Sequence, residues 1–496
     1  MRQHEHERSV GLRREHRQFQ PGFWEWLTTL GRSMREWRRR DSELASEVSA
    51  AERALSAVLG DMSQLAHDVQ SAEHSVDQAE ATLRRCERDF AAVDDVIEQA
   101  RHKLGPQFPD ERWRQDRTER ELCALWTDAE WNRARTELFL QALQLHRAFL
   151  EHMPVKMRQS LHGVADILDG QAPDNLPKGA ALAAWQALFF IVPVVSTTFA
   201  SFARLFSHLK QEDLGWLFVD EAGQAVPQGA VGALWRSRRA VVLGDPLQLE
   251  PIVDLPFRAE QAIRRNHGVG EEWLTSRSSV QRLADRLNDL GTWLPGDDKR
   301  IWVGAPLTVH RRCGRPMFGI VNDMAYEGLM IDGTSSVWED HFREDYPTLP
   351  ESKWIDVASS RGQGHWRHDE GRQLDRILRT LAALDFDMTE VLVIGPFRDV
   401  AQRIREHCRR YPGVVAGTIH TAQGRQAEIV VLVLGSDPQR PGARRWAASR
   451  PNLLNVAVSR AKRRLYVIGD REAWRHERYF SVLAHRLPHA TPITHT

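Results

Sequence analysis

The stretch WLFVDEAGQAVPQGAVGALWRSRRAVVLGDPLQLEP, residues 216–251, determines how the rest of the chain is interpreted. It contains two short apolar runs, 216–219 and 240–243, each of which ends in a carboxylate at the point where a strand would stop. Continuous apolar runs of this kind are typical of strands buried on both faces of a parallel sheet. Ligands of such sheets bind just outside the carboxyl ends of the strands. We therefore expect Asp220-Glu221 and Gly244-Asp245 to face one crevice.

These carboxylates have the chemistry of a phosphoryl-transfer site. Asp220 is placed to hold Mg²⁺, directly or through a water molecule, and Glu221 to orient and deprotonate an attacking water. Gln248, a short loop beyond the second run, is placed to sense a γ-phosphate. An Asp-Glu pair after an apolar run is common by chance, whereas the segment GDPLQLEP at 244–251 is far less so.

The two segments resemble motifs II and III of the superfamily 1 helicases, in the branch that includes the nonsense-mediated-decay helicase. The resemblance covers residues 189–470. It implies an α/β fold of two RecA-like P-loop NTPase domains with ATP and Mg²⁺ between them and single-stranded DNA or RNA as the partner. Asp220, Gly244 and Asp245 would then lie at the nucleotide.

Two further strand ends carry residues that the family uses on the nucleic-acid backbone. The apolar run 189–195 is expected to be a buried strand, followed by Ser196, Thr197 and Thr198. Hydroxyls and backbone N–H groups at a strand end suit phosphates. A second strand at 391–394 is expected to lead into the turn 395–398, which contains Pro396.

Residues 307–330 resemble motif IV and the helix behind it. The family has one arginine here that reaches the nucleotide phosphates, and this chain has two adjacent candidates, Arg311 and Arg312. Counting back from Tyr326, the counterpart of an aromatic in the family's Phe-Tyr-x-Gly signature, favours Arg312. We expect the Tyr326 ring to belong to the core rather than to stack on a base.

Residues 413–428 resemble motif V. In the family, positions corresponding to Thr418, His420 and Gln423 contact the nucleic-acid backbone and couple it to ATP. Gly424 allows the backbone to approach a ligand closely. Many relatives have a ribose-binding Glu where this chain has Gln426, which can hydrogen-bond but carries no charge.

Residues 452–470 resemble motif VI. Helical spacing is expected to place Asn455, Ser459 and Arg463 on one side, with Arg460 beside them. In the family the arginine of the Val-Ala-x-Ser/Thr-Arg-Ala signature, here Arg460, crosses the domain interface as an arginine finger. Its permanent charge stabilises the charge that develops on the γ-phosphoryl oxygens.

The amino-terminal part is Ala-, Glu-, Arg- and Leu-rich. From Leu44 to Leu104 apolar residues alternate at spacings of four and three, which predicts a left-handed coiled coil with a helix roughly 90 Å long. A second helical stretch at 112–152 is expected to fold back on part of it. The charges are intermixed without a basic stripe, which favours partner docking over a direct nucleic-acid contact.

We therefore expect five consecutive parts. They are a disordered or weakly helical leader (1–22), a helical coiled-coil insertion (23–168), the remainder of a first RecA-like domain (180–285), a second RecA-like domain (300–485) and a tail (486–496).

Composition narrows the class of protein. The 496 residues carry a formal net charge of zero, so a nucleic-acid surface must be a local patch. The four cysteines include no CxxC pair, which argues against a zinc site or a disulfide framework and fits a cytoplasmic location. There is no signal peptide and no apolar run of about 18 residues, so we expect no membrane association.

A G-x-x-x-x-G-K-[ST] loop, which cradles phosphates in motors of this kind, is missing, and the chain contains no Gly-Lys dipeptide. Three explanations stay open: a split gene, a separately encoded amino-terminal helicase half, or a degenerate relative. In each, the first domain is expected to be incomplete, with unpaired strand edges, and the chain alone to hydrolyse little ATP.

Two other classes compete with the helicase interpretation. One is a non-hydrolysing nucleic-acid-binding or scaffold protein derived from a helicase. The other is a helicase–nuclease, which has weak support because the tail after Asp470 is short and shows no carboxylate cluster with nuclease spacing.

Overall fold

The computed structural model describes residues 2–29, 31–105, 108–123, 129–173, 175–296, 299–334, 336–358 and 361–490. The chain divides into two compact units, Met1–Phe108 and Pro109–Thr496. Within the described ranges, no helix combines the length and the apolar content that crossing a bilayer requires.

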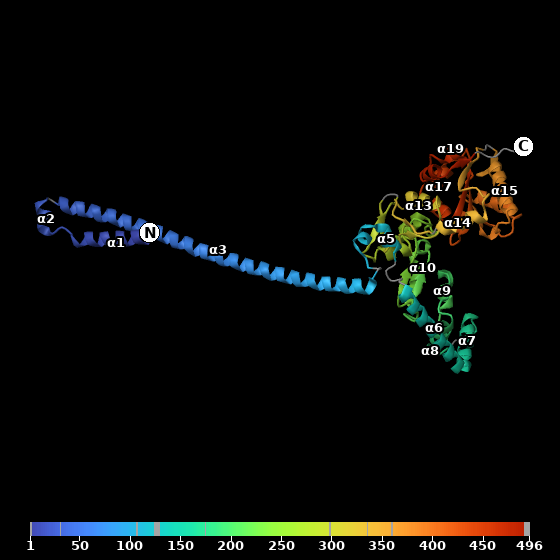
Figure 1. Ribbon diagram of the computed structural model, residues 1–496, viewed down its shortest axis with the longest axis horizontal. Coiled ribbons are helices and arrows are strands. Elements are labelled where there is room, and N and C mark those ends of the chain that lie inside the picture. The colour runs from blue at the N-terminus through green and yellow to red at the C-terminus, as the bar shows by residue number, and fades with distance from the viewer. Residues whose placement is uncertain are drawn as a thin grey trace. The chain divides into compact units, whose positions relative to one another are not determined.

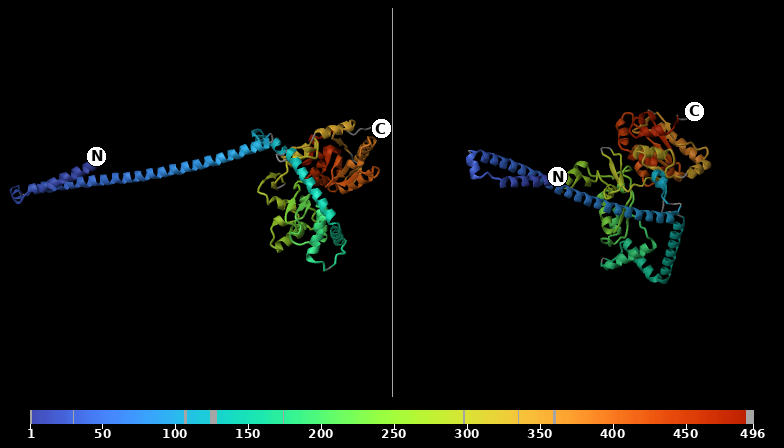
Figure 2. Two further views of the ribbon diagram at one scale, coloured as in Figure 1. Left: turned by 60° about the horizontal axis from the view of Figure 1, so that its bottom comes forward. Right: turned by 60° about the vertical axis from the view of Figure 1, so that its left-hand side comes forward.

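The first unit is a helical hairpin of α1 (Arg2–Gln18), α2 (Phe23–Thr28) and α3 (Arg32–Leu104). In all views α1 runs back along the beginning of α3 (Figures 1 and 2). The indole Nε1 of Trp37 donates to the carbonyl oxygen of His16 at 3.0 Å, and Arg17 forms an ion pair with Asp41 at 3.1 Å. Residues 2–18, which we expected to be disordered or weakly helical, are therefore a packed helix.

The predicted long helix is present, and α3 continues through Gly60 without a break. Leu44 and Val48 are buried at its beginning. The apolar residues that recur at spacings of four and three between Leu44 and Leu104 form the seam of α3. Farther along α3, seam residues such as Val76 and Phe90 are 56% and 69% exposed. Pairing of this seam as a coiled coil stays a prediction. The helix ends at Gly105, whose φ of 52° favours glycine, after a last turn whose basic residues suit the helix dipole.

The second unit begins with helices: α4 (Glu111–Gln115), α5 (Arg117–Leu122), α6 (Ala129–His152), α7 (Pro154–Leu168), α8 (Lys178–Ile191) and α9 (Phe199–Leu205). The stretch 112–152 is therefore not one helix. Asp116 interrupts it, because its carboxylate accepts hydrogen bonds from the backbone of Thr118 and Glu119 and caps α5. Residues 124–128 of that stretch lie outside the described residues.

The predicted buried strand at 189–195 is wrong. Phe189 and Phe190 form the last turns of α8, and residues 192–198 have no strand partner in the described structure. Phe189 follows Trp185 by four residues, and the two rings stack with centroids 5.7 Å apart on one face of the helix. Trp185 is itself buried against Phe206. Packing of the aromatic side chains on one face of α8 therefore stabilises a helix, although the apolar run has strand propensity.

The strands predicted around the two acidic turns are present. β1 (Leu217–Val219) pairs in parallel with β2 (Ala240–Val242), and α10 (Pro227–Arg236) connects them. They are not buried on both faces as expected, because Trp216 and Phe218 are 56% and 63% exposed. Only the opposite face is covered, where Val219 packs with Ala222, Ala230 and Val280.

An antiparallel hairpin of β3 (Gly291–Leu294) and β4 (Ile301–Gly304) follows in the chain. The elements around it are α11 (Phe257–Asn266), α12 (Val280–Asp285), β5 (Val309–His310), α13 (Met317–Ala325), β6 (Ile331–Asp332) and α14 (Ser336–Asp345).

A parallel six-stranded sheet in the order β11-β10-β12-β13-β7-β14 forms the main core, so the α/β class is confirmed. Residues of β10, β12 and β13 are almost all fully buried. The strands are β7 (Lys353–Asp356), β10 (Val391–Gly395), β11 (Val415–Thr418), β12 (Ala427–Val433), β13 (Ala461–Gly469) and β14 (His489–Ala490). The helices are α15 (His368–Ala383), α16 (Arg398–Cys408), α17 (Pro441–Ala447), α18 (Asn452–Ser459), α19 (Arg471–Trp474) and α20 (Phe480–Arg486).

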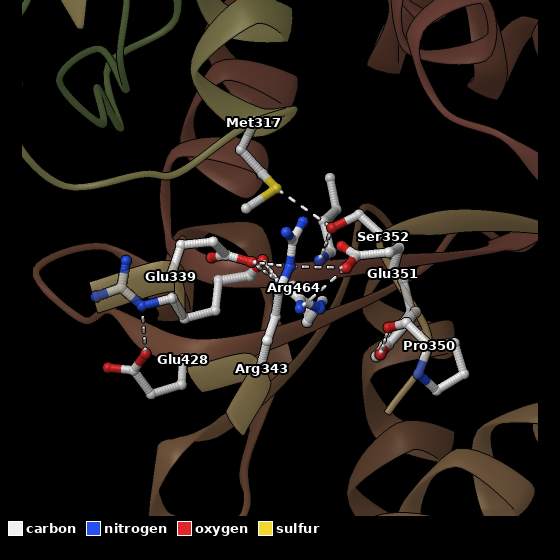
Figure 3. A network of polar contacts seen from close by, with 11 residues as sticks. Met317, Glu339, Arg343, Pro350, Glu351, Ser352, Glu428 and Arg464 are labelled. Carbon is white, nitrogen blue, oxygen red and sulfur yellow. Dashed lines mark hydrogen bonds and ion pairs between the residues drawn. The ribbon is translucent and has the colours of Figure 1, made fainter. Parts of the chain in front are cut away.

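A network of polar contacts anchors β13 (Figure 3). The Arg464 guanidinium is 1% exposed, lies 2.6 Å from the carboxylate of Glu339 and 3.4 Å from that of Glu351, and so ties β13 to α14 and to the loop before β7. Ser352 Oγ accepts from the backbone N–H of Leu465 at 3.0 Å. This network fixes the part of the chain that directly follows Arg460.

We predict that Arg464→Met lowers the free energy of unfolding by about 2–4 kcal/mol, because two carboxylates lose their buried partner. The matched control is Arg343→Met. Arg343 contacts the same two carboxylates at 3.5 and 3.1 Å but is 56% exposed, so its loss should cost less than about 1 kcal/mol. Urea unfolding of both variants measures the difference, and equal effects would contradict the assignment.

Candidate functional site

Two acidic turns form one side of the candidate site. Asp220 and Glu221 follow β1, and the Glu221 backbone has a left-handed φ of 52°. This conformation is uncommon for a non-glycine residue and is often found at functional sites. The turn after β2 lies close by, since a Cβ on Gly244 would be 2.8 Å from the backbone nitrogen of Gly223. Gly244 is therefore required where the two turns meet.

Arg460 approaches from the other side. It lies between α18 and β13, is 2% exposed, and donates through Nη2 to Gln248 Oε1 at 2.7 Å. Its Nη1 donates to the carbonyl oxygen of Arg425 at 3.3 Å. Burial is the main cause that lowers the pKa of Arg460, the nearby Arg312 lowers it further, and the charge of Glu221 opposes both.

A second contact connects the two sides. Gln423, in the loop before β12, donates through Nε2 to Glu221 Oε2 at 3.2 Å. Gln224 donates to the same oxygen at 3.4 Å. The structure therefore brings together five of the residues singled out in the sequence, which we call the Glu221 cluster: Glu221, Asp245, Gln248, Gln423 and Arg460.

Asp245 is half-buried, and its carboxylate is already engaged by neighbouring side chains. The Tyr326 hydroxyl donates to its Oδ2, and Gln248 Nε2 donates to the same oxygen at 3.0 Å. Burial raises the pKa of Asp245, and the hydrogen bonds from Tyr326, Leu247 and Gln248 oppose that rise. Burial, followed by the Asp245 charge, raises the pKa of Tyr326 well above its usual value.

Asn455 completes this arrangement from α18. Its side-chain amide donates to the Tyr326 hydroxyl and to the carbonyl oxygen of Leu247, both at 2.9 Å. Tyr326 packs partly buried against the main core, which agrees with the expectation for its ring. Sequence reasoning missed its hydroxyl contact with Asp245, because residues so far apart in the chain carry no local signal for it.

Two more contacts of this interface were not predicted. Asn452 donates to the carbonyl oxygen of Gln248, and Arg450 forms an ion pair with Glu250. Both pairs lie at or next to the segments that resemble motifs III and VI. Apart from these motifs, the sequence gives no indication of the two contacts. The predicted helical alignment of Arg463 is wrong, because α18 ends at Ser459 and Arg463 lies in β13, 3.3 Å from Glu428.

The remaining nucleotide-site candidates lie around the cluster. Asp220 is exposed, and one of its oxygens accepts from the backbone of Glu221 at 2.9 Å. Arg312 is exposed and close enough to Arg460 to lower its pKa. Gly424 has a φ of 72°, and it and Gln426 are exposed on either side of Arg425, whose carbonyl binds Arg460.

The candidates for nucleic-acid contact are not joined to the Glu221 cluster, apart from Gln423. Among the described residues, Ser196 and Thr197 are exposed and make no hydrogen bond to it, and Thr198 Oγ1 caps α9 by accepting from the backbone of Ser201 at 3.3 Å. Pro396 is buried, so its ring does not offer a contact surface. Thr418 also serves as a helix cap, with the hydroxyl of Thr421.

His420 is exposed, like Ser196 and Thr197. Partial burial is the main cause that lowers its pKa, and the charge of Arg398 adds to the effect. Its imidazole therefore favours the neutral form near pH 7.

Few side chains that could bind a metal ion lie near the Glu221 cluster. Within the described parts of the chain, no three His, Cys, Asp or Glu side chains are grouped as a metal cage. Mg²⁺ commonly needs only one or two carboxylates when substrate phosphates and water complete its coordination. The exposed Asp220 carboxylate fits that role.

Comparisons with known proteins agree with the motifs. Residues 31–254 match a family model described as an AAA domain, and residues 299–472 match a second model with the same description. The DNA replication ATP-dependent helicase/nuclease DNA2 of Gallus gallus is 25% identical over 303 residues, which are 57% of this chain and 26% of that protein. A probable helicase of Dictyostelium discoideum is 31% identical over 268 residues, 52% of this chain and 25% of that protein.

The chain thus spans about a quarter of the length of these two relatives. Among solved structures, the arterivirus nonstructural protein 10 helicase is similar at 18% identity and a TM-score of 0.24, over 51% of this chain and 39% of that one. Its complex with DNA gives 16% identity and a TM-score of 0.23 over the same shares of the two chains.

We predict that Tyr326→Phe and Asn455→Ala each destabilise the second unit by about 1–3 kcal/mol, because each leaves a buried polar partner unpaired. A double-mutant cycle in urea should give a coupling energy of about 1 kcal/mol, since the two groups are 2.9 Å apart. Tyr411→Phe is the control: Tyr411 packs partly buried on the core, and its hydroxyl has no hydrogen bond in the described structure. That change should stay within about 0.5 kcal/mol. A coupling energy near zero would show that the contact does not persist in solution.

Proposed function

Because the chain belongs to the superfamily 1 helicases, we propose that it works as the carboxyl-terminal portion of an ATP-dependent helicase, coupling ATP hydrolysis to movement along single-stranded DNA or RNA. The observation that carries this proposal is the Glu221 cluster. Its acidic members, Glu221 and Asp245, follow strands β1 and β2. The guanidinium group of Arg460 precedes strand β13 of the six-stranded sheet. In this proposal the two α/β parts act as RecA-like domains, the first of them incomplete.

Each member of the cluster has a role that follows from its charge and contacts. Glu221 is the base for the attacking water, because its carboxylate can accept a proton. It lies where the two sides of the site meet, since it accepts a hydrogen bond from Gln423 at 3.2 Å. Gln248 and Arg460 hydrogen-bond to each other, and a γ-phosphate oxygen would replace this contact. Arg312 would add a second positive charge, as its effect on the pKa of Arg460 indicates.

Mg²⁺, when bound with ATP, would neutralise phosphate charge during the transfer. Asp220 would hold it, and Asp245 would act indirectly, because its carboxylate is already engaged by Tyr326 and Gln248. Gly244, Gly424 and Gln426 would border the nucleotide. The backbone near Gly424 is within reach because Arg425 contacts Arg460.

We assign nucleic-acid contacts to Ser196, Thr197, Thr198, Thr418, His420, Gln423 and the turn that contains Pro396. The buried ring of Pro396 restricts that turn to contacts by its backbone and by the exposed Arg398. Gln423 would couple the two ligands, since it also reaches Glu221. The seam of α3 would dock a partner helix as a coiled coil.

A separately encoded amino-terminal half would supply the phosphate-binding loop. The two-stranded sheet of β1 and β2 supports this partner, because it exposes Trp216 and Phe218. Exposed apolar strands with unpaired edges are a liability that another strand can cover. The thiols of Cys86, Cys123, Cys313 and Cys408 are all free, which supports a cytoplasmic location.

We predict that the purified chain alone shows no ATPase stimulated by nucleic acid. Addition of a polypeptide with a strand and a G-x-x-x-x-G-K-[ST] loop should give turnover, measured as phosphate release. Glu221→Gln should then reduce the rate by about 100-fold or more, because the general base is lost. Binding of a fluorescent single strand should be retained.

Asp254→Asn serves as the matched carboxylate control, because Asp254 is exposed and outside the cluster. It should leave the restored rate unchanged. Turnover by the chain alone would contradict the need for a second polypeptide. If the chain binds the strand but no turnover appears under any condition, the alternative of a non-hydrolysing nucleic-acid-binding or scaffold protein is favoured.

A further inference from the structure

A second polar site lies at the carboxyl ends of the strands of the six-stranded sheet. It is a cavity of about 150 Å³ lined by residues of β9 (Trp366–Arg367), α15, α17 and α19 and of the loops after β7, β12 and β13, and it includes no residue of the Glu221 cluster. Its polar lining residues are Arg367, Glu370, Ser436, Arg444 and Asp470.

The topology of the sheet explains why a cavity forms here. The neighbouring strands β13 and β7 are parallel, and the chain leaves them in opposite directions along the sheet: from β7 toward β10 and from β13 toward β14. Right-handed crossovers then place the two connections on opposite faces. A crevice opens between them outside the carboxyl ends of the strands, where open α/β sheets bind ligands.

Several buried polar atoms of the lining residues have no hydrogen bond in the part of the chain that the structure describes. Glu370 is 1% exposed; its Oε2 accepts from the backbone of Gly435 at 2.8 Å, but its Oε1 has no hydrogen bond among the described residues. Arg367 is 5% exposed and donates to the carbonyl oxygen of Gly364, while its Nε is likewise unpaired in the described structure. An unsatisfied buried group typically costs about 1–3 kcal/mol, so these atoms favour a polar occupant.

The wall offers mainly hydrogen-bond donors. Arg444 donates through Nη1 to Ser436 Oγ at 2.6 Å, which leaves the Ser436 hydroxyl proton for another acceptor. Burial raises the pKa of Glu370 to about 8, so at neutral pH its carboxyl group is protonated and adds a further donor. Two guanidinium groups, a hydroxyl and a carboxylic acid together suit an occupant rich in acceptor oxygens.

Volume sets an upper limit on the occupant. A cavity of about 150 Å³ accommodates a molecule near the size of benzene. A tetrahedral oxoanion with a few attached atoms fits this space, whereas a whole nucleotide does not.

We propose that this cavity binds a phosphate group, free or at the end of a nucleic-acid strand, with the guanidinium groups of Arg367 and Arg444 as its main ligands. The site does not depend on ATP hydrolysis at the Glu221 cluster. The charged groups that face Glu370 are Arg367, Arg444, Asp369 and Asp470, and Glu477 lies 3.8 Å from Arg444. The carboxylates of Asp369, Asp470 and Glu477 offset part of the positive charge of the two arginines. They therefore limit the occupant to a single anionic group.

Sulfate titrated into the full chain tests the proposal, because its charge is constant between pH 6 and pH 9. Calorimetry at constant ionic strength, with chloride as balancing anion, should show saturable binding at one site. The affinity should fall about tenfold between pH 7 and pH 9, because ionised Glu370 repels the anion. Absence of saturable binding would mean that only water occupies the cavity and would overturn the proposal.

Two variants make the test specific. Glu370→Gln keeps an acceptor for the Gly435 backbone and a donor toward the cavity, so sulfate should still bind, now with the same affinity at pH 7 and pH 9. Arg444→Gln should weaken binding at pH 7 at least tenfold, with an unchanged circular dichroism spectrum. Sulfate binding that is unaffected by Arg444→Gln, or that depends on pH equally in Glu370→Gln and the parent chain, would refute the assignment.

Competition then identifies the source of the phosphate. Inorganic phosphate should displace sulfate in either case. A short oligothymidylate with a 5′-phosphate should displace it only if the cavity accepts a strand end, and the same oligonucleotide with a 5′-hydroxyl is the control. Displacement by both oligonucleotides alike would contradict recognition of a terminal phosphate.

Discussion

The contact between Arg460 and Gln248 is the constraint on which the candidate site depends. A guanidinium that is 2% exposed must be held by polar partners, and the partners here are the Gln248 side chain and the carbonyl oxygens of Arg425 and Val456. Gln248 belongs to the turn after β2, whereas the two carbonyls lie next to β12 and in α18. The buried charge therefore fixes three separate segments in one arrangement.

That arrangement rests on the larger sheet. β13 begins at Ala461, directly after Arg460, and Arg464 ties it to Glu339 and Glu351. On the other side, Tyr326 and Asn455 hold the Asp245 turn. In the described structure the sheet of β1 and β2 is covered on one face only, and Phe218 is exposed on the other. The cavity around Arg367 and Glu370 lies at the carboxyl ends of the same large sheet, so one rigid core would position two anion-binding regions.

The sequence predicted the parts of this architecture that follow from local patterns. Apolar runs that end in acidic turns located β1 and β2, and the motif resemblance located the segment of α18 and β13. The strand predicted at 189–195 is wrong, because a short apolar run does not distinguish a strand from a buried helix. The ring stacking of Trp185 and Phe189 decides that choice. The hydroxyl contact of Tyr326 with Asp245 and the Glu370 Oε1 atom, which has no hydrogen bond among the described residues, depend on tertiary packing, which no local pattern encodes.

Crosslinking in solution tests most directly whether the two sides of the site meet. Glu221→Cys and Gln423→Cys, combined in the full chain, should be joined within one molecule by a short bismaleimide, because the parent side chains are 3.2 Å apart. Mass spectrometry of the digested protein should identify peptides linked through positions 221 and 423 in high yield, and the single variants, which keep the four native thiols, should not give this pair. Failure of the pair to crosslink, with both thiols shown to react with a monofunctional maleimide, would contradict the meeting of the two sides of the site at Glu221 and Gln423.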